Sequence, residues 1–196
     1  MFTGIIQYLG IFKAYGRGKQ ELLLAVPPGF PGLPPGESVA VNGVCLSLTR
    51  REGQRLVFDL SKETLLMTHL GSLRPGDRLN LEVPLTLQSL LSGHLLTGHI
   101  DGRGRVLSFA EKRPGKRLRI AFPPETRPYL VPKGSIAVNG VSLTVAQLGP
   151  AYFEVELVPV TIGKSNLADL KIGQAVNLEC DILGKYVYNW VCQFKK

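Results

Sequence analysis

The sequence predicts an all-β protein of two tandem six-stranded Greek-key barrels, related by internal duplication and followed by a C-terminal amphipathic α-helix. The main observation is that Ser38–Leu46 returns as Ser135–Leu143, with seven of nine positions identical. In addition, Gly and Pro residues punctuate short apolar runs, a pattern typical of β-strands joined by tight turns. Finally, apolar residues near the C-terminus recur at helical spacing.

Each copy of the repeat centres on an Asn-Gly pair, which is Asn42-Gly43 in the first copy and Asn139-Gly140 in the second. Because both residue types tolerate positive φ and alternating apolar residues flank them, each pair predicts a tight hairpin. The two hairpins lie 97 residues apart in a chain of 196 residues, which indicates one duplicated module. The expected boundaries are residues 1–94 for the first barrel, 95–182 for the second and 183–196 for the helix.

The strands expected in the first module are short and are separated by turn residues. They are Gly4–Phe12, Glu21–Val26, Ser38–Val41, Cys45–Thr49, Arg55–Leu60 and Leu79–Val83. The proline-rich stretch 27–36 fits a loop. The segment 62–70 has a mixed pattern that is compatible with a short helix or with a loop.

The second module repeats this plan, and its start Leu96–Ile100 matches Phe2–Ile6 in spacing. Its strands are expected at Val106–Phe109, Arg117–Phe122, both arms of the second hairpin, Phe153–Leu157 and Asn177–Glu179. Six short strands in so few residues would leave exposed edges in an open sheet, and exposed edges invite aggregation. Closure of each module into a small barrel is therefore expected.

The formal net charge is +8, but the Lys and Arg residues are scattered and few aromatic residues lie among them. The densest basic stretch, Lys112–Arg119, contains Pro and Gly and is interpreted as a solvated turn. A nucleic-acid partner is therefore not expected. No apolar run approaches the roughly 18 residues that span a membrane, so no membrane partner is expected either.

The three cysteines, Cys45, Cys180 and Cys192, form no CxxC pair. No zinc site is therefore expected, and no other metal constellation is visible in the sequence. The odd cysteine count and the lack of a recognisable export signal favour a reducing compartment, so we expect a cytoplasmic protein.

The tail after the second module has no counterpart in the first. Its apolar residues recur at three- and four-residue spacing: Leu183, Tyr186, Val187, Trp190, Val191 and Phe194. This spacing predicts an amphipathic helix with one broad apolar stripe, which needs a surface to cover. The helix either caps its own barrel or pairs with copies of itself, and the sequence leaves both arrangements open.

Short polar residues occupy matching positions in the two modules: Thr3 with Thr97, Cys45 with Ser142, Ser47 with Thr144, and Thr64 with Thr161. On strands that alternate inward and outward, Cys45 and Ser47 share one face, as do Ser142 and Thr144. One interpretation is that these side chains fill the barrel interiors and bond to backbone. The other is a pair of related ligand pockets.

The three histidines differ in their setting. His69 lies in a turn-like region, where we expect an exposed side chain. His94 and His99 flank the start of the second module, and His99 stands where the first module has Ile5. This change from an apolar to an ionisable residue suggests that the two modules now have different roles.

The sequence resembles the riboflavin synthase family (the α-chain type, with its lumazine-binding repeat) along its whole length. The resemblance rests on the start Met1–Ile5 and on the segments Asn42–Leu46, Lys62–Leu65, Gly93–Leu95, Gly98–Gly102, Lys133–Ser135, Ser142–Thr144 and Asp181–Tyr186. It implies two similar six-stranded barrels and a homotrimer assembled through the C-terminal helix. It also implies sites between the N-terminal barrel of one subunit and the C-terminal barrel of its neighbour.

The reaction implied by the resemblance requires no cofactor. Two molecules of 6,7-dimethyl-8-(1-D-ribityl)lumazine exchange a four-carbon unit, which gives riboflavin and 5-amino-6-(D-ribitylamino)uracil. A duplicated pocket suits two identical substrates, because holding both converts a bimolecular encounter into an effectively unimolecular step, worth roughly 7–11 kcal/mol at best. The resemblance leaves open an association with lumazine synthase.

The site residues are carried over by resemblance. The N-terminal pocket would use Gly4, Ile5, Ile6, Cys45, Leu46, Ser47, Thr64, Gly98, His99 and Ile100, and Asp59, Lys62 and Glu63 are further substrate-binding candidates. The C-terminal pocket would use Lys133, Ser142, Leu143, Thr144, Val158 and Thr161. Proton transfer is assigned to Ser142, Thr144 and His99, with Cys45 as a nucleophile or proton-handling group. Asp181 and Lys133 are expected to assist.

Two positions depart from the family pattern, both in the second module. Asn139 stands where some relatives carry Asp, and Val160 stands where His or Glu is expected. The alternative to an enzyme is a non-catalytic lumazine- or flavin-binding protein of the same fold, in which one barrel has lost its ligand. The polar set survives in both modules, and this favours the enzyme.

Overall fold

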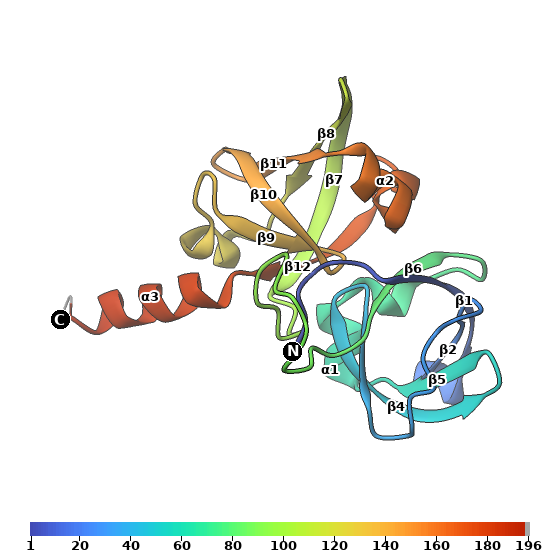
Figure 1. The fold of residues 1–196 in the computed structure, drawn as a ribbon. Helices are drawn as coiled ribbons and strands as arrows, with labels where there is room; N and C mark the ends of the chain where they lie inside the picture. Colours follow the sequence, from blue (N-terminus) through green and yellow to red (C-terminus); the bar gives the residue numbers. More distant parts are fainter. Residues whose placement is uncertain (195–196) are drawn as a thin grey trace.

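The protein is described by a computed structural model that covers residues 1–194 of the 196-residue chain. Two β-barrels lie against each other, and one helix projects away from them (Figure 1). This architecture confirms the two predicted tandem barrels and the predicted C-terminal helix.

The first barrel is closed and has the strand order β1-β2-β5-β4-β3-β6. Its strands are β1 Tyr8–Gly16, β2 Glu21–Ala25, β3 Ser38–Val41, β4 Val44–Glu52, β5 Arg55–Asp59 and β6 Arg78–Glu82. Between β5 and β6 lie helix α1, Lys62–Met67, and a 3₁₀ turn at His69–Ser72, while a shorter 3₁₀ turn, Arg17–Lys19, joins β1 to β2.

The second barrel is also closed, with the order β10-β11-β8-β7-β12-β9. Its strands are β7 Gly102–Lys112, β8 Gly115–Ala121, β9 Ser135–Val138, β10 Val141–Leu148, β11 Tyr152–Leu157 and β12 Ala175–Cys180. Helix α2, Pro159–Lys164, and the 3₁₀ turns Pro124–Tyr129 and Asn166–Asp169 complete it. Adding six to each strand number of the first barrel gives the same cyclic order, so the duplication extends to the topology.

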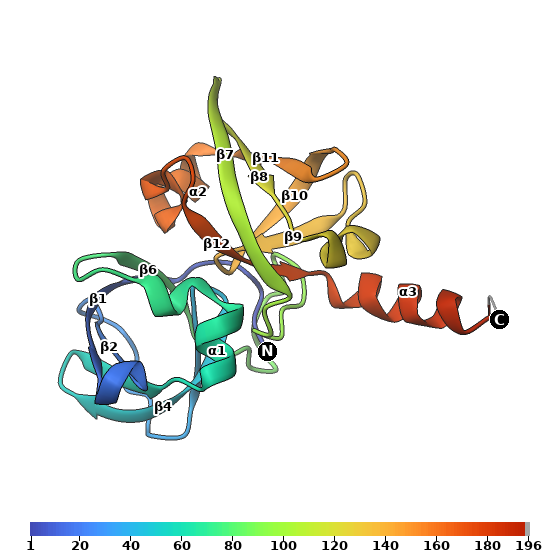
Figure 2. The ribbon, with the colours of Figure 1, turned by 180° about the vertical axis from the view of Figure 1, so that it is seen from behind.

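Some element boundaries differ from the sequence-based expectation. The first strand begins at Tyr8 rather than Gly4, because Thr3 and Gly4 are held by hydrogen bonds to the Glu82 side chain. The ambiguous segment 62–70 forms α1 and the start of the following 3₁₀ turn, and the start of α1 is capped by the Ser61 hydroxyl accepting from Thr64 N. The basic stretch Lys112–Arg119 is mostly strand, and only residues 113–114 form its turn. Figure 2 shows β7 running along the whole second barrel from the junction between the barrels.

Alternation along the hairpin strands decides which side chains enter the barrels. Leu46 and Leu48 on β4 are buried in the first core, whereas Cys45 and Ser47 point outward. On β10, Leu143 is buried in the second core while Ser142 and Thr144 point outward. The interpretation that these polar residues fill the barrel interiors is therefore wrong. Their side chains lie on the outer walls of the barrels.

The two Asn-Gly turns meet back to back at the junction between the barrels. A Cβ built on Gly43 would lie 2.7 Å from Gly140 N, and one built on Gly140 would lie 2.6 Å from Gly43 N. Both glycines have positive φ, and a side chain at either position would collide with the backbone of the other turn. The repeated segment that revealed the duplication in the sequence therefore forms the contact between its two copies.

Buried amides join the barrels around these turns in a reciprocal way. Asn80 Nδ2 donates to Asn139 O, and its counterpart Asn177 Nδ2 donates to Asn42 O, both over 2.9 Å. Asn80 Oδ1 accepts from Asn166 N, and Asn177 Oδ1 accepts from His69 N. Buried polar groups that are fully paired in this way stabilise one relative placement of the two barrels.

Candidate functional site

The segment that precedes each barrel crosses over to the other barrel. Ser142 N in the second hairpin donates to Gly4 O over 2.9 Å, and Cys45 N in the first hairpin donates to Gly98 O over 3.0 Å. Ile6 accordingly packs on the second core and Ile100 packs on the first. Each outward-facing polar hairpin is thus completed by a segment from the other repeat.

Two buried carboxylates hold these crossing segments. Glu82 accepts from Thr3 N, Thr3 Oγ1 and Gly4 N over 2.6–2.9 Å. Its counterpart Glu179 accepts from Thr97 N, Thr97 Oγ1 and Gly98 N. Burial raises the pKa of both carboxyls, and the hydrogen bonds from Thr and Gly oppose that shift. Thr3 and Thr97 are therefore positioning residues for the walls of the site.

A cavity of about 170 Å³ lies on the outer wall of the second barrel. It is lined by Gly4, Ile5, Ile6, Val141, Ser142, Val160, Thr161, Lys164 and Ser165. We expected Gly4, Ile5 and Ile6 beside Cys45 in the N-terminal pocket, and that assignment is wrong because the chain crosses between the barrels. The signal for crossing is not in the local sequence, since it depends on how the two barrels pack.

Ser142 has a histidine partner. His94 Nδ1 lies 2.7 Å from Ser142 Oγ, and the imidazole is 8% exposed. Burial lowers the pKa of His94 while Asp181 opposes the shift, so the ring is neutral at pH 7. His94 Nε2 has no hydrogen-bond partner among residues 1–194. From the sequence we expected no role for His94, and its position beside the Thr97-Gly98 segment is the signal that points to one.

Around Cys45 the neighbours are different. A Cβ on Gly98 would lie 2.4 Å from Cys45 Cβ, so the crossing segment lies directly on the cysteine. His99 follows Gly98 and is exposed. Thr64 is half-buried, and its hydroxyl lies 2.9 Å from Ser61 Oγ at the start of α1. Beside it, a cavity of about 360 Å³ is lined partly by Asp59 and Lys62.

The remaining predicted site residues lie in varied surroundings. Leu46 and Leu143 point into the cores, so only their backbone groups face the outer walls. Ser47, Glu63, Thr144 and Val158 are exposed. Lys133 has φ +67° and its N donates to Val145 O. Asp181 caps α3, Ile182–Gln193, by accepting from Leu183 N over 3.0 Å.

The predicted exposure of His69 is wrong. We expected it to be exposed, but it is 6% exposed and its Nε2 lies 3.1 Å from Asn42 Nδ2. Burial lowers the pKa of His69 to about 4, so it is neutral at pH 7. It occupies the position of Asn166 in the second repeat and belongs to the junction between the barrels.

Within residues 1–194, no group of three or more His, Cys, Asp or Glu side chains is arranged to hold a metal ion. None of the helices in the same range has the length and apolar character that crossing a membrane would require.

Two closed barrels, each with outward-facing polar residues covered by a segment from the other repeat, define a tandem-barrel protein with small-molecule pockets. Its sequence matches the lumazine binding domain twice, over residues 3–84 and 97–181. It is 39% identical to the riboflavin synthase of Mycobacterium tuberculosis (strain ATCC 25618 / H37Rv), covering 95% of this chain and 96% of that protein. The riboflavin synthase of Actinobacillus pleuropneumoniae is 36% identical, with 95% and 88% covered. The chain belongs to the riboflavin synthase family of lumazine-binding proteins.

Solved structures with the same fold include LumP complexed with riboflavin, with a TM-score of 0.82 and 27% identity. That match covers 92% of this chain and 99% of LumP. LumP complexed with 6,7-dimethyl-8-(1'-D-ribityl) lumazine matches with a TM-score of 0.80 and 28% identity, covering 91% and 98%. The relatives of this fold therefore include proteins named for an enzymatic activity and a protein solved with bound ligands.

Proposed function

We propose that this chain is a riboflavin synthase, a transferase that dismutates two 6,7-dimethyl-8-(1-D-ribityl)lumazine molecules. A four-carbon unit passes from one to the other, and the products are riboflavin and 5-amino-6-(D-ribitylamino)uracil. The observation that carries the proposal is that both barrels keep polar groups on the covered outer wall, around Cys45 and around Ser142. Full-length relatives named riboflavin synthase support it.

In the second pocket, Ser142 and His94 form the pair suited to moving a proton. A neutral imidazole can accept a proton through one ring nitrogen while the other is a donor. His94 Nδ1 accepting from Ser142 Oγ would increase the basicity of the hydroxyl oxygen toward a bound substrate. We assign proton transfer to Ser142 and Thr144, with His94 as the positioning residue of Ser142 and Lys133 as a neighbour that binds substrate.

In the first pocket, we assign proton handling to Cys45 and His99 and substrate binding to the residues around them. Those residues are Leu46, Ser47, Asp59, Lys62, Glu63, Thr64, Gly98 and Ile100. We reassign Gly4, Ile5 and Ile6 to the second pocket. Leu143, Val158 and Thr161 are assigned to the same pocket. The two pockets then bind identical substrate molecules but surround them with different side chains, as a reaction with one donor and one acceptor molecule requires.

We also propose a homotrimer assembled through α3. The helix contacts the second barrel chiefly where Tyr188 meets the Tyr129 ring, with centroids 5.4 Å apart. Its apolar side chains are largely exposed, at 68% for Leu183 and 64% for Trp190. Exposed apolar area of this kind is typical of an interface. In the trimer, Asp181 would lie at the boundary between subunits, where it could assist catalysis.

For the domains we keep the predicted boundaries 1–94, 95–182 and 183–196 as part of the proposal, and the last two residues of the third range lie outside the described part of the chain. A cytoplasmic location fits the three free cysteines. Association with lumazine synthase would bring the substrate from its source, and co-purification of the two proteins would test it.

The function is tested by incubating the purified chain with the lumazine and following riboflavin absorbance. We expect conversion of two lumazines into one riboflavin. Stoichiometric binding without conversion would instead identify a lumazine- or flavin-binding protein. Deleting residues 182–196 and measuring the mass in solution tests the trimer, and a truncated chain that stayed trimeric would contradict the role of α3.

A further inference from the structure

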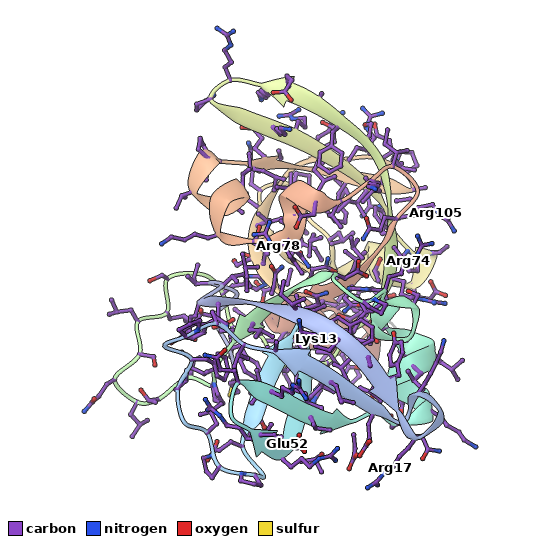
Figure 3. The ribbon with its side chains drawn as sticks, turned by 90° about the vertical axis from the view of Figure 1, so that its right-hand side faces the viewer. Lys13, Arg17, Glu52, Arg74, Arg78 and Arg105 are labelled. Carbon is purple, nitrogen blue, oxygen red and sulfur yellow. The ribbon has the colours of Figure 1, made fainter. Side chains whose placement is uncertain are left out.

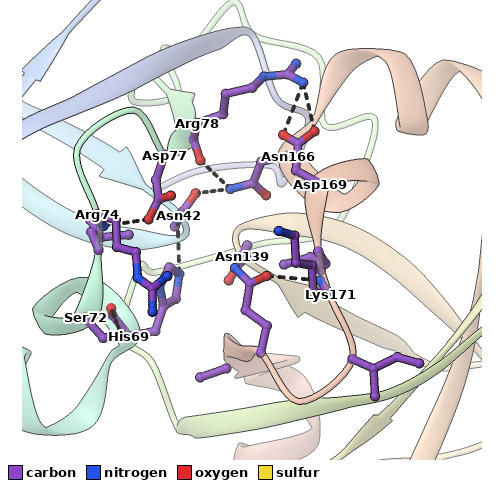
Figure 4. A pocket seen from close by; sticks show the side chains of 15 residues that line it. Asn42, His69, Ser72, Arg74, Asp77, Arg78, Asn139, Asn166, Asp169 and Lys171 are labelled. Atoms are coloured by element: carbon purple, nitrogen blue, oxygen red, sulfur yellow. Dashed lines mark hydrogen bonds and ion pairs between the residues drawn. The ribbon is translucent and has the colours of Figure 1, made fainter.

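A second, larger cavity lies at the junction between the two barrels. Its volume is about 410 Å³, and it shares no lining residue with the cavity beside Ser142. Figure 4 shows that its walls come from both barrels, with the buried side chains Asn42, His69, Asn139 and Asn166 among its lining. A volume of this size holds a small metabolite.

The walls are formed by equivalent residues of the two repeats. The turn after each 3₁₀ segment contributes a cation at the same position, Arg74 in the first repeat and Lys171 in the second, 97 residues apart. Arg78 pairs with Asp169 across the cavity mouth, with 3.1 Å between nitrogen and oxygen. The cavity therefore lies on the approximate two-fold axis that relates the barrels, with Arg74 on one side and Lys171 on the other.

Most of the side-chain acceptors that line the cavity are already engaged. Asp77 Oδ2 accepts from Arg74 N, and Gln174 Oε1 accepts from Lys171 N. Both oxygens of Asp169 face Arg78. The Asn42 Oδ1, Asn139 Oδ1 and Asn166 Oδ1 atoms accept hydrogen bonds within the amide network.

The strongest donors, in contrast, are free. Neither the Arg74 guanidinium nor the Lys171 ammonium has a hydrogen bond or ion pair with any side chain of residues 1–194. Arg105 pairs with the lining residue Ala175 across the sheet and lies on the same side of the molecule (Figure 3). The net charge of +8 adds a positive field. A cavity in which most acceptors are engaged, and two cationic donors have no side-chain partner among residues 1–194, favours an anion that carries only acceptors.

We propose that this junction cavity binds a phosphate-bearing small molecule, with the phosphate between Arg74 and Lys171. A phosphate group offers acceptor oxygens to a guanidinium fork and to an ammonium at once. The remaining volume takes the polar body of a phosphorylated metabolite, which can bond to Gln174 and Ser72. Such a ligand would touch both repeats and bind the folded junction in preference to the unfolded chain.

The test is calorimetric titration of the full chain with orthophosphate and with ribose 5-phosphate, in sodium chloride of matched ionic strength. Ribose serves as the uncharged probe. The test variant is Arg74→Gln/Lys171→Gln. The matched control, Lys13→Gln/Arg55→Gln, removes the same charge from exposed positions outside the cavity.

We expect both phosphates to bind saturably, one per chain, and ribose not to bind. The cavity variant should weaken phosphate binding at least tenfold and the control variant less than twofold. Riboflavin formation should stay within twofold of the unmodified chain in both variants. No saturation by either phosphate, or equal weakening in the two variants, would overturn the proposal and leave the proposed function standing, because binding is measured without turnover.

Discussion

The junction between the barrels and the two outer pockets differ in how faithfully the duplication was kept. At the junction, Asn42 matches Asn139 and Asn80 matches Asn177, and their hydrogen bonds are reciprocal. At the pockets, Cys45 stands where the second repeat has Ser142, and within residues 1–194 only Ser142 has a buried histidine partner. Symmetry is retained where two copies must pack on each other, and it is lost where two like molecules must be treated differently.

The largest expected effect comes from breaking the junction with Gly43→Ala. The new Cβ would lie 2.7 Å from Gly140 N at a φ of +80°, so we expect the free energy of unfolding to fall by about 3–5 kcal/mol. Urea titration measures it. Gly53→Ala is the control, because φ is +61° there but no atom lies within 4 Å. Equal losses in the two variants would show that packing of the turns contributes nothing.

His69 breaks the symmetry of the junction, and its effect should depend on pH. Since burial lowers its pKa to about 4, the unfolded chain takes up the proton first as pH falls from about 6.5. Stability should therefore fall between about pH 6.5 and 4, by up to about 3 kcal/mol, and change no further below that window.

His69→Asn copies the residue that the second repeat has at position 166, and it should remove this dependence. The difference in the pH dependence of stability between the unmodified chain and the variant reports on His69 alone. This matters because burial also lowers the pKa of His94. Urea midpoints at several pH values measure it. Parallel plots of the urea midpoint against pH for the two chains would contradict the assignment of this pH dependence to His69.

Ser142→Ala probes the pocket that contains the histidine. We expect kcat to fall by roughly 100-fold if Ser142 moves a proton, equivalent to about 2.7 kcal/mol. His99→Gln tests the other pocket. If both variants retain near wild-type rates while still trimeric, the acid–base assignment is wrong.

His94→Asn separates positioning from proton acceptance in the same pocket. Asn offers an oxygen near the place of Nδ1, so the hydrogen bond to Ser142 can persist without a titratable group. We expect roughly tenfold lower kcat with KM unchanged and a flatter pH profile on the acid side. A loss equal to that of His94→Ala would show that the retained hydrogen bond contributes nothing and that proton acceptance by the imidazole alone matters.

The sequence predicted the barrels well, because hairpin turns and strand alternation are local properties. It also predicted that Cys45 and Ser47 share a face, but not that this face is the outer wall. The crossing of Gly4–Ile6 to the second barrel and the burial of His69 depend on how two modules pack. That information lies in contacts such as those between residues 108 and 135 positions apart.

Cys45→Ser should have the smallest effect and compares the two pockets most directly. The variant gives the first hairpin the residue that the second hairpin already has, at an outward-facing, half-buried position. A hydroxyl releases its proton far less readily than a thiol, so we expect roughly tenfold lower kcat, about 1.4 kcal/mol, if Cys45 handles a proton. The control is Cys192→Ser on α3, checked for unchanged mass in solution. An unchanged rate in Cys45→Ser would assign the difference between the pockets to His94 and His99 instead, since the hairpins would then be chemically equivalent.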